Sequence, residues 1–289
     1  MKKSFLYLLS TAALFLTVSP AIAQEDNQPA TQSENYLKMD AENDTIEPDS
    51  TDQLHPRKNP FTGDYKNIAK INLTSLAFTT FSLQYERLLP HKMSVALGIK
   101  FRPNTALPLK NQINNLVIGD EEDKELTTFL ESTKINSFVI TPEFRYYFGK
   151  TAGKGFYLAP FLRYEHYNLS STFTFTDMND MKTNVPFKGS MENIGIGLLI
   201  GSQFKIGERF TLDWWILGPY YSFSSKLNLK ASGFNFQPED QEILQESLED
   251  LEISWFKTES KVTATSANLT MKGKLGGIRA FGLCFGFKF

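Results

Sequence analysis

The chain has 289 residues, with 30 basic and 32 acidic side chains and a formal net charge of −2. This balance excludes a polybasic nucleic-acid-binding protein, and a hydrophobic content of 41% excludes a helical membrane bundle. The single cysteine, Cys284, excludes a disulfide scaffold and a cysteine-based zinc site. Phenylalanine, in contrast, occurs 25 times, which suits an aromatic-rich exported protein.

The first 23 residues predict a secretory signal peptide. Lys2 and Lys3 precede a short apolar stretch, residues 5–18, and Ala21-Ile22-Ala23 supplies the small residues of a cleavage site. The apolar stretch is too short for a transmembrane helix, and no cysteine follows for a lipid anchor. We therefore expect an exported chain that is cleaved after Ala23.

Residues 24–65 predict an acidic, disordered periplasmic leader. Between Gln24 and His55 there are nine acidic residues and one basic residue, Lys38, and almost no apolar side chains. Such a segment cannot bury enough apolar surface to offset the entropy lost on ordering. It serves either as a docking tail or simply as a solvated leader.

From residue 66 to residue 289 the hydrophobic period is two. Apolar residues occupy alternate positions from Met93 to Phe101, from Phe138 to Phe148 and from Phe281 to Phe289, with polar or small residues between them. This alternation is typical of strands with one apolar face. We predict eight antiparallel strands: 66–76, 79–89, 92–103, 135–149, 154–172, 190–206, 209–224 and 275–289.

The connections favour a membrane barrel over a soluble sandwich. Short turns follow the second, fourth and sixth strands, whereas long connections follow the third, fifth and seventh, at 104–134, 173–189 and 225–274. This sorting is typical of an outer-membrane barrel with periplasmic turns and surface loops. We expect an all-β, eight-stranded, antiparallel up-and-down transmembrane β-barrel. A lipocalin-like soluble barrel, with its apolar face inward, is the alternative.

Aromatic side chains on the apolar face predict two belts, one at each membrane interface. The belt near the short turns contains Phe148, Phe156, Phe204, Phe210, Phe287 and Phe289. The belt at the other end contains Phe81, Phe101, Phe138, Tyr164 and Tyr220.

Three sequence segments resemble an uncharacterised Bacteroidota family of outer-membrane barrels, domain of unknown function 3575. They are Asn67–Leu73, Gln84–Arg87 and Leu212–Pro219. The resemblance covers residues 66–289 and implies the barrel fold without an activity. The C-terminal residues also resemble the signal that the barrel assembly machinery recognises during biogenesis, carried here by Gly282, Phe285, Phe287 and Phe289.

The polar face of the predicted strands carries a set of charges that we expect inside the barrel. They are Lys70, Glu86, Lys100, Glu143, Arg145, Arg163, Glu165 and Asp213. Four of them lie at a similar distance from the predicted turns and should share one layer: Lys70, Glu86, Arg145 and Asp213. A lumen of eight strands is filled by side chains, so a salt-bridged plug is the expected arrangement, with a narrow channel as the alternative.

The sequence contains few candidate catalytic residues. His166 lies near Glu165, Ser170 and Ser171, which leaves a lipid-modifying enzyme as a further alternative. No metal-ligand spacing surrounds any histidine, so no metal and no cofactor are expected. We expect a protein that is not an enzyme.

Two segments of the long connections show helical spacing, residues 120–130 and 238–251. These short surface helices either dock a partner or cap the barrel rim. The sequence thus predicts an outer-membrane barrel with a filled lumen that is structural or an interaction platform. The expected partners are outer-membrane lipid and lipopolysaccharide, the barrel assembly machinery and a surface or periplasmic protein, with no nucleic acid.

Overall fold

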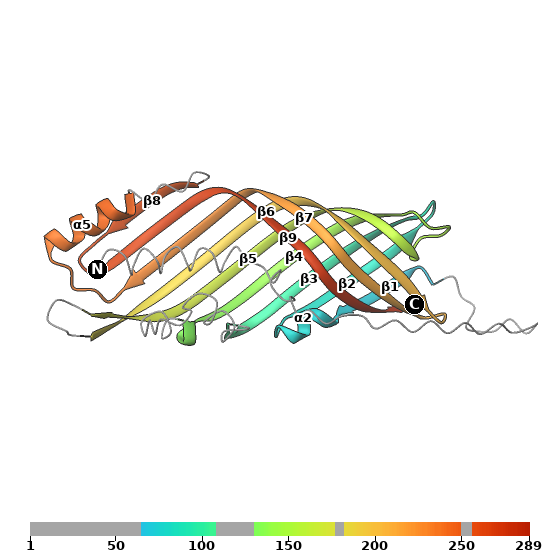
Figure 1. Ribbon diagram of the computed structural model, residues 1–289, viewed down its shortest axis with the longest axis horizontal. Coiled ribbons are helices and arrows are strands. Elements are labelled where there is room, and N and C mark those ends of the chain that lie inside the picture. The colour runs from blue at the N-terminus through green and yellow to red at the C-terminus, as the bar shows by residue number, and fades with distance from the viewer. Residues whose placement is uncertain (1–64, 108–129, 177–181, 250–255) are drawn as a thin grey trace, which may run out of the picture. The chain divides into compact units, whose positions relative to one another are not determined.

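The computed structural model describes residues 65–107, 130–176, 182–249 and 256–289 (Figure 1). The predicted signal peptide, almost all of the predicted leader and nearly all of the predicted helix at 120–130 lie outside these ranges. No helix of the described part is long and apolar enough to cross a membrane.

The described strands form one antiparallel sheet that closes on itself (Figure 1). Each strand pairs with the next from β1 to β7, β9 follows β7, and β1 pairs with β9 to complete the ring. Eight strands therefore build an up-and-down barrel, as predicted, and β8 is added to the free edge of β9. The strands are β1 (Asn67–Asn72), β2 (Phe81–Leu89), β3 (Met93–Ala106), β4 (Lys134–Tyr147), β5 (Gly155–Thr176), β6 (Lys182–Ile206), β7 (Phe210–Ser232), β8 (Phe256–Val262) and β9 (Ser266–Lys288).

The barrel wall is uneven in height. β5, β6, β7 and β9 continue well beyond the predicted ends of their strands, so much of the expected loop sequence is strand. β1 is shorter than predicted, because Asn72 caps a one-turn helix, α2 (Leu73–Ala77), by accepting a hydrogen bond from the Ser75 backbone nitrogen at 2.9 Å. The ring of eight strands therefore closes only near the short-turn end.

Tight turns connect the strands at that end. His91 and Lys92 have φ angles of 59° and 68° in the β2–β3 turn, and Gly207 has a φ of 59° in the β6–β7 turn. Left-handed backbone at these positions matches a short hairpin connection to the twist of the paired strands. The predicted positions of the short turns are confirmed.

We call the half of the barrel next to the short turns, where all eight strands pair, the lower barrel. Its outward face is apolar. All six aromatic residues of the predicted turn-side belt are exposed, as are Phe81, Phe101, Phe138 and Tyr164 of the other belt. Tyr220 is an exception, because its ring turns inward toward Phe161 and Glu165. Tyr221 and Phe223 take the outward positions there. A wall of exposed apolar side chains around a polar lumen is suited to lipid.

The longer strands form a second region, which we call the outer extension: residues 134–136 of β4, 166–176 of β5, 182–192 of β6, 225–232 of β7 and 266–273 of β9, with β8. Here most of the inward side chains are apolar and form one buried cluster, which includes Phe187, Met191, Leu229 and Leu269. The same strands thus change from a polar to an apolar interior along their length.

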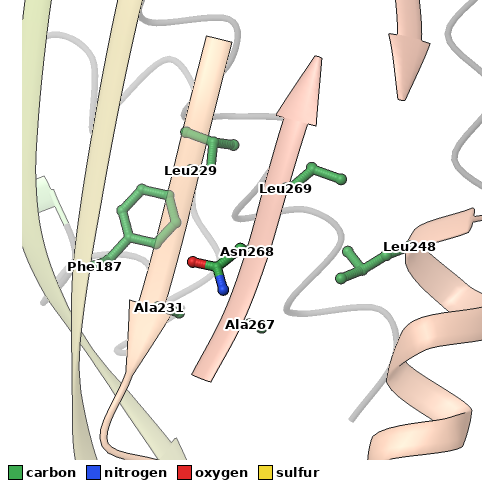
Figure 2. A pocket seen from close by; sticks show the side chains of 7 residues that line it. All are labelled: Phe187, Leu229, Ala231, Leu248, Ala267, Asn268 and Leu269. Carbon is green, nitrogen blue, oxygen red and sulfur yellow. The ribbon is translucent and has the colours of Figure 1, made fainter. Parts of the chain in front are cut away.

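The helix α5 (Pro238–Glu249) covers part of this apolar interior. It places Leu248 in the cluster, with 1% of its surface exposed, and Gln245 accepts a hydrogen bond from the Val262 backbone of β8 at 2.8 Å. In Figure 2, Leu248 of α5 faces the sheet. The cavity between them has a volume of only about 10 Å³, which is no larger than one water molecule. The predicted helix at 238–251 thus packs on the extension as a cap, while its docking of a partner stays a prediction.

Candidate functional site: the charge network of the lumen

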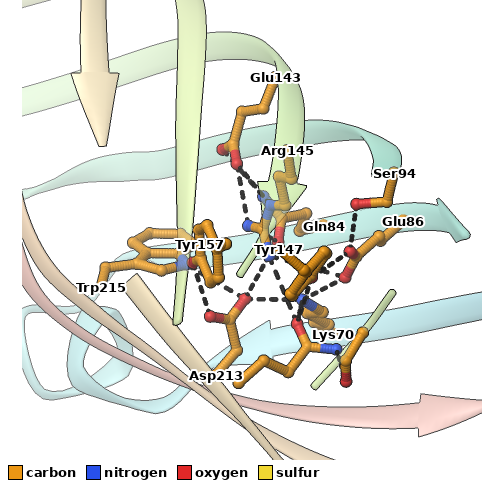
Figure 3. Close-up of polar contacts among 12 residues, drawn as sticks. Lys70, Gln84, Glu86, Ser94, Glu143, Arg145, Tyr147, Tyr157, Asp213 and Trp215 are labelled. Carbon is orange, nitrogen blue, oxygen red and sulfur yellow. Dashed lines mark hydrogen bonds and ion pairs between the residues drawn. The ribbon is translucent and has the colours of Figure 1, made fainter. Parts of the chain in front are cut away.

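The deepest charges lie together in one layer near the short-turn end (Figure 3). Asp213 of β7 binds Lys70 of β1 at 2.6 Å and Arg145 of β4 at 2.7 Å through the same carboxylate oxygen. Glu86 of β2 binds Lys70 at 2.6 Å and lies 3.6 Å from Arg145. The side chains of all four residues have no exposed surface, so the layer crosses the lumen without a water-filled gap around them.

Glu143 extends this layer toward the middle of the barrel. Its two carboxylate oxygens bind Arg145 at 2.9 Å and Arg279 of β9 at 2.5 Å. The cluster therefore contains three acidic and three basic residues, whose formal charges cancel. Such pairing is what makes buried charges tolerable, since an unpaired ion in a low-dielectric interior is very costly.

Neutral side chains satisfy the remaining oxygens and nitrogens. The Tyr157 hydroxyl donates to Asp213 at 2.7 Å, and the Tyr147 hydroxyl donates to Glu86 at 2.6 Å. Gln203 accepts from Lys70 at 2.6 Å and donates to the Gly153 carbonyl at 3.2 Å, which ties the network to the β4–β5 turn. These contacts together link seven of the eight barrel strands, all but β3, to one of the short turns.

Aromatic rings pack on the guanidinium groups of the network. Arg145 lies 4.5 Å from the centre of the Tyr157 ring, and Arg279 lies 3.7 Å from that of Trp215. Cation–π contacts of this kind strengthen when both groups are desolvated. The rings of Tyr157 and Trp215 also fill the part of the lumen that the charged side chains do not occupy.

A second, smaller group lies nearer the outer extension. Arg163 and Glu165 of β5 form an ion pair at 2.7 Å, and Tyr220 donates to Glu165 at 3.0 Å. Lys100 also faces this part of the lumen, where the nearby charges acting on it are Arg163, Glu165, Arg279 and Arg102. Among the described residues Lys100 forms no ion pair, unlike the seven other predicted lumen charges.

Sequence alternation missed Arg279 because the inward parity of β9 changes near Phe281. Inward residues are odd-numbered up to Arg279 and even-numbered from Gly282 onward. Phe281 lies between them with a φ of 55°, in the left-handed region that a bulky residue rarely adopts. The parity of β7 also changes, between Trp215 and Gly218, which explains the incorrect position predicted for Tyr220.

The residues considered for lipid-modifying chemistry do not converge. His166 faces outward, where its ring contacts Asn168 at 2.9 Å and Glu192 at 3.5 Å. Glu165 faces the lumen and is engaged by Arg163, and Ser171 hydrogen-bonds Ser132 on the inner side. The acid and one of the two serines therefore lie across the sheet from the histidine.

The residues of the predicted assembly signal lie on the last strand beside the β1 seam. Phe285 and Phe287 pair in register with Ile71 and Ala69, and their rings pack on Phe210. Gly286 lies against Lys70 and Thr211, where a larger side chain would have no room. This arrangement gives the signal residues a role in closing the barrel, while their recognition during biogenesis stays a prediction.

The fold and its lumen together define a transmembrane β-barrel whose interior is filled by paired charges. A family model described as "Protein of unknown function (DUF3575)" matches residues 61–243. Because this match covers more than half of the chain, the chain belongs to that family, and the resemblance found in the sequence is confirmed.

Two solved barrels are similar to this chain at a distance. Acinetobacter baumannii CarO is 14% identical, with a TM-score of 0.36 over 72% of this chain and 95% of that one. The N-terminal β-barrel domain of Pseudomonas aeruginosa OprF is 12% identical, with a TM-score of 0.23 over 78% of this chain and 98% of that one. Similarity this low carries no argument about function. No curated protein sequence matches the chain.

Proposed function

We propose that the protein is a non-enzymatic barrel of the outer membrane that acts as a structural element and interaction platform, not as a channel. The observation that carries the proposal is the buried charge layer. Lys70, Glu86, Arg145 and Asp213 bridge β1, β2, β4 and β7 with no exposed side-chain surface. A diffusion pathway would need water between these groups.

The platform is the outer extension. Its apolar interior is covered in part by Leu248 of α5, so this region is stabilised by a buried apolar cluster of its own. Its outer face is free to meet the environment of the cell surface. In this proposal the charge layer in the lumen stabilises the barrel wall, and the outer extension presents the surface to which a partner binds.

Planar-bilayer recording of the purified barrel tests this proposal. We expect the current to stay at the level of the bare membrane, because the charge layer fills the cross-section. Stepwise conductance that reverses near the potential of a permeant ion would overturn the proposal. The control is a heat-modifiable band on cold and boiled gels, which shows that the protein tested is folded.

A second assay addresses the enzymatic alternative. Lipid A from cells with and without the protein is compared by mass spectrometry, alongside cells producing His166→Ala. We expect identical lipid A in all three. A mass change that needs the protein and disappears with His166→Ala would show a lipid-modifying enzyme instead.

A further inference from the structure

The outer face of the outer extension carries three rows of polar side chains, each row formed by residues that pair in register across neighbouring strands. The row nearest the apolar wall contains His166, Glu192, Lys226, Lys272 and Lys257. The middle row contains Asn136, Asn168, Ser190, Asn228, Thr270 and Glu259. The third row contains Lys134, Ser170, Lys188, Lys230, Asn268 and Lys261. We call these three rows the lysine–asparagine face.

Positive charge accumulates on this face. The face carries seven lysines and only two glutamates. Glu259 pairs with Lys272 at 3.0 Å, and Glu192 lies 3.5 Å from His166. Lys188 lies directly opposite Lys230, and neither has a carboxylate partner within the described part of the chain. Like charges placed opposite each other destabilise a sheet, and a bound anion would relieve their repulsion.

The middle row is a line of side chains that can form hydrogen bonds, some of them with each other. Asn168 donates to Asn136 at 3.0 Å, and Thr270 donates to Asn228 at 3.2 Å. A cavity of about 440 Å³ lies over this line, and its lining includes Asn168, Lys188 and Lys230. This volume falls within the range of small-ligand sites. Amide and hydroxyl groups there can pair with the hydroxyls of a sugar.

The position of the face along the barrel suits a lipid headgroup. On β4, Phe138 ends the exposed aromatic belt and Lys134 of the third row is only four residues away. Four residues of strand span about 13 Å, and strand tilt makes the height above the apolar wall smaller still. The cavity therefore lies just outside the level of the hydrocarbon.

We propose that the lysine–asparagine face binds the phosphorylated sugar headgroup of a glycolipid in the leaflet around the outer end of the barrel. Lys188 and Lys230 would bind a phosphoryl group, and the asparagine line would bind the sugar hydroxyls. This assignment rests on the membrane placement proposed above, and it specifies which ligand chemistry the platform takes.

The test measures binding of diphosphoryl lipid A to the full processed protein in phosphatidylcholine nanodiscs. We expect saturable binding that Lys188→Gln/Lys230→Gln weakens about tenfold, because two charge-assisted contacts are lost. The matched control is Lys150→Gln/Lys154→Gln, which removes the same charge from exposed positions in the β4–β5 turn. The control should bind like the unmodified protein.

Two further probes identify the source of the phosphate. Dephosphorylated lipid A should bind about tenfold more weakly than the diphosphoryl form. Inorganic phosphate at millimolar concentration should fail to displace the lipid, because it lacks the sugar. Equal binding of both lipid forms, displacement by inorganic phosphate, or equal losses in the two double variants would overturn the proposal. Each protein tested should also show the heat-modifiable band. A loss of lipid binding with the band intact then concerns the lysine–asparagine face, whereas loss of the band means that the barrel has not folded.

Discussion

The lower barrel and the outer extension are made by the same strands but are built inside out relative to each other. Along β5, Phe161, Arg163 and Glu165 face inward below, whereas Leu169 faces inward above and Ser170 faces outward. The lower wall is apolar outside and charged inside, and the extension is polar outside and apolar inside. The inversion indicates where the surroundings change from lipid to water, because each region buries the groups that its surroundings disfavour.

The largest effect should come from breaking the charge layer of the lower barrel. Arg145→Ala leaves Asp213, Glu143 and Glu86 with too few cationic partners. We expect the free energy of unfolding to fall by about 3–5 kcal/mol, since removing one member of a buried ion pair leaves a charge uncompensated. Urea unfolding in detergent, followed by the heat-modifiable band, measures this loss.

Arg87→Ala is the matched control, because it removes an arginine from the outward face of β2 in the same barrel. Its effect should be small. If Arg145→Ala unfolds at the same urea concentration as Arg87→Ala, then the charge layer does not hold the lower barrel together.

A smaller and local loss of stability is expected from weakening the contact between α5 and the apolar cluster of the outer extension. Leu248→Ala removes a side chain that is 1% exposed from the cluster under α5, at a cost of about 2–3 kcal/mol. Protease should then cut residues 233–262 while the barrel keeps its heat-modifiable band. Ile243→Ala, at a position that is 45% exposed, should resist protease like the unmodified protein. Loss of the heat-modifiable band in Leu248→Ala would show that the two regions unfold together.

The smallest effect concerns the repulsion on the outer face. Lys188→Thr removes one of two lysines that face each other across β6 and β7. Stability should rise by about 0.2–1 kcal/mol at low salt, and the gain should shrink as salt is added. Lys261→Thr, where the residue opposite is Asn268, should bring no such gain. A fall in the urea midpoint of Lys188→Thr would contradict the repulsion.

Sequence alternation sufficed for the barrel and for most of the charge layer, since strand parity alone placed Lys70, Glu86, Arg145 and Asp213 on one face. It failed where parity changes, near Phe281 and between Trp215 and Gly218, because a local backbone irregularity has no fixed sequence signature. For this reason alternation does not place Arg279 in the lumen, and it places Tyr220 on the outward face.

The outer extension does not follow from the sequence pattern for a different physical reason. Its strands alternate too, as in Ala267, Leu269 and Met271 between polar residues. These segments are polar overall and therefore read as surface loops. The three-dimensional contacts among these strands, together with Leu248 of α5, show that their apolar face is buried.

Accessibility of spin labels along β6 tests the inversion most directly. The background is Cys284→Ser, which removes the single cysteine, and labels are placed at Ile196, Ile200, Lys188 and Glu192. All four positions lie on the outward face. In membranes, we predict that labels at Ile196 and Ile200 collide mainly with oxygen, and that labels at Lys188 and Glu192 collide mainly with a water-soluble nickel chelate. If the nickel chelate reaches Ile196 and Ile200 equally well, lipid does not surround the lower barrel and the account is wrong.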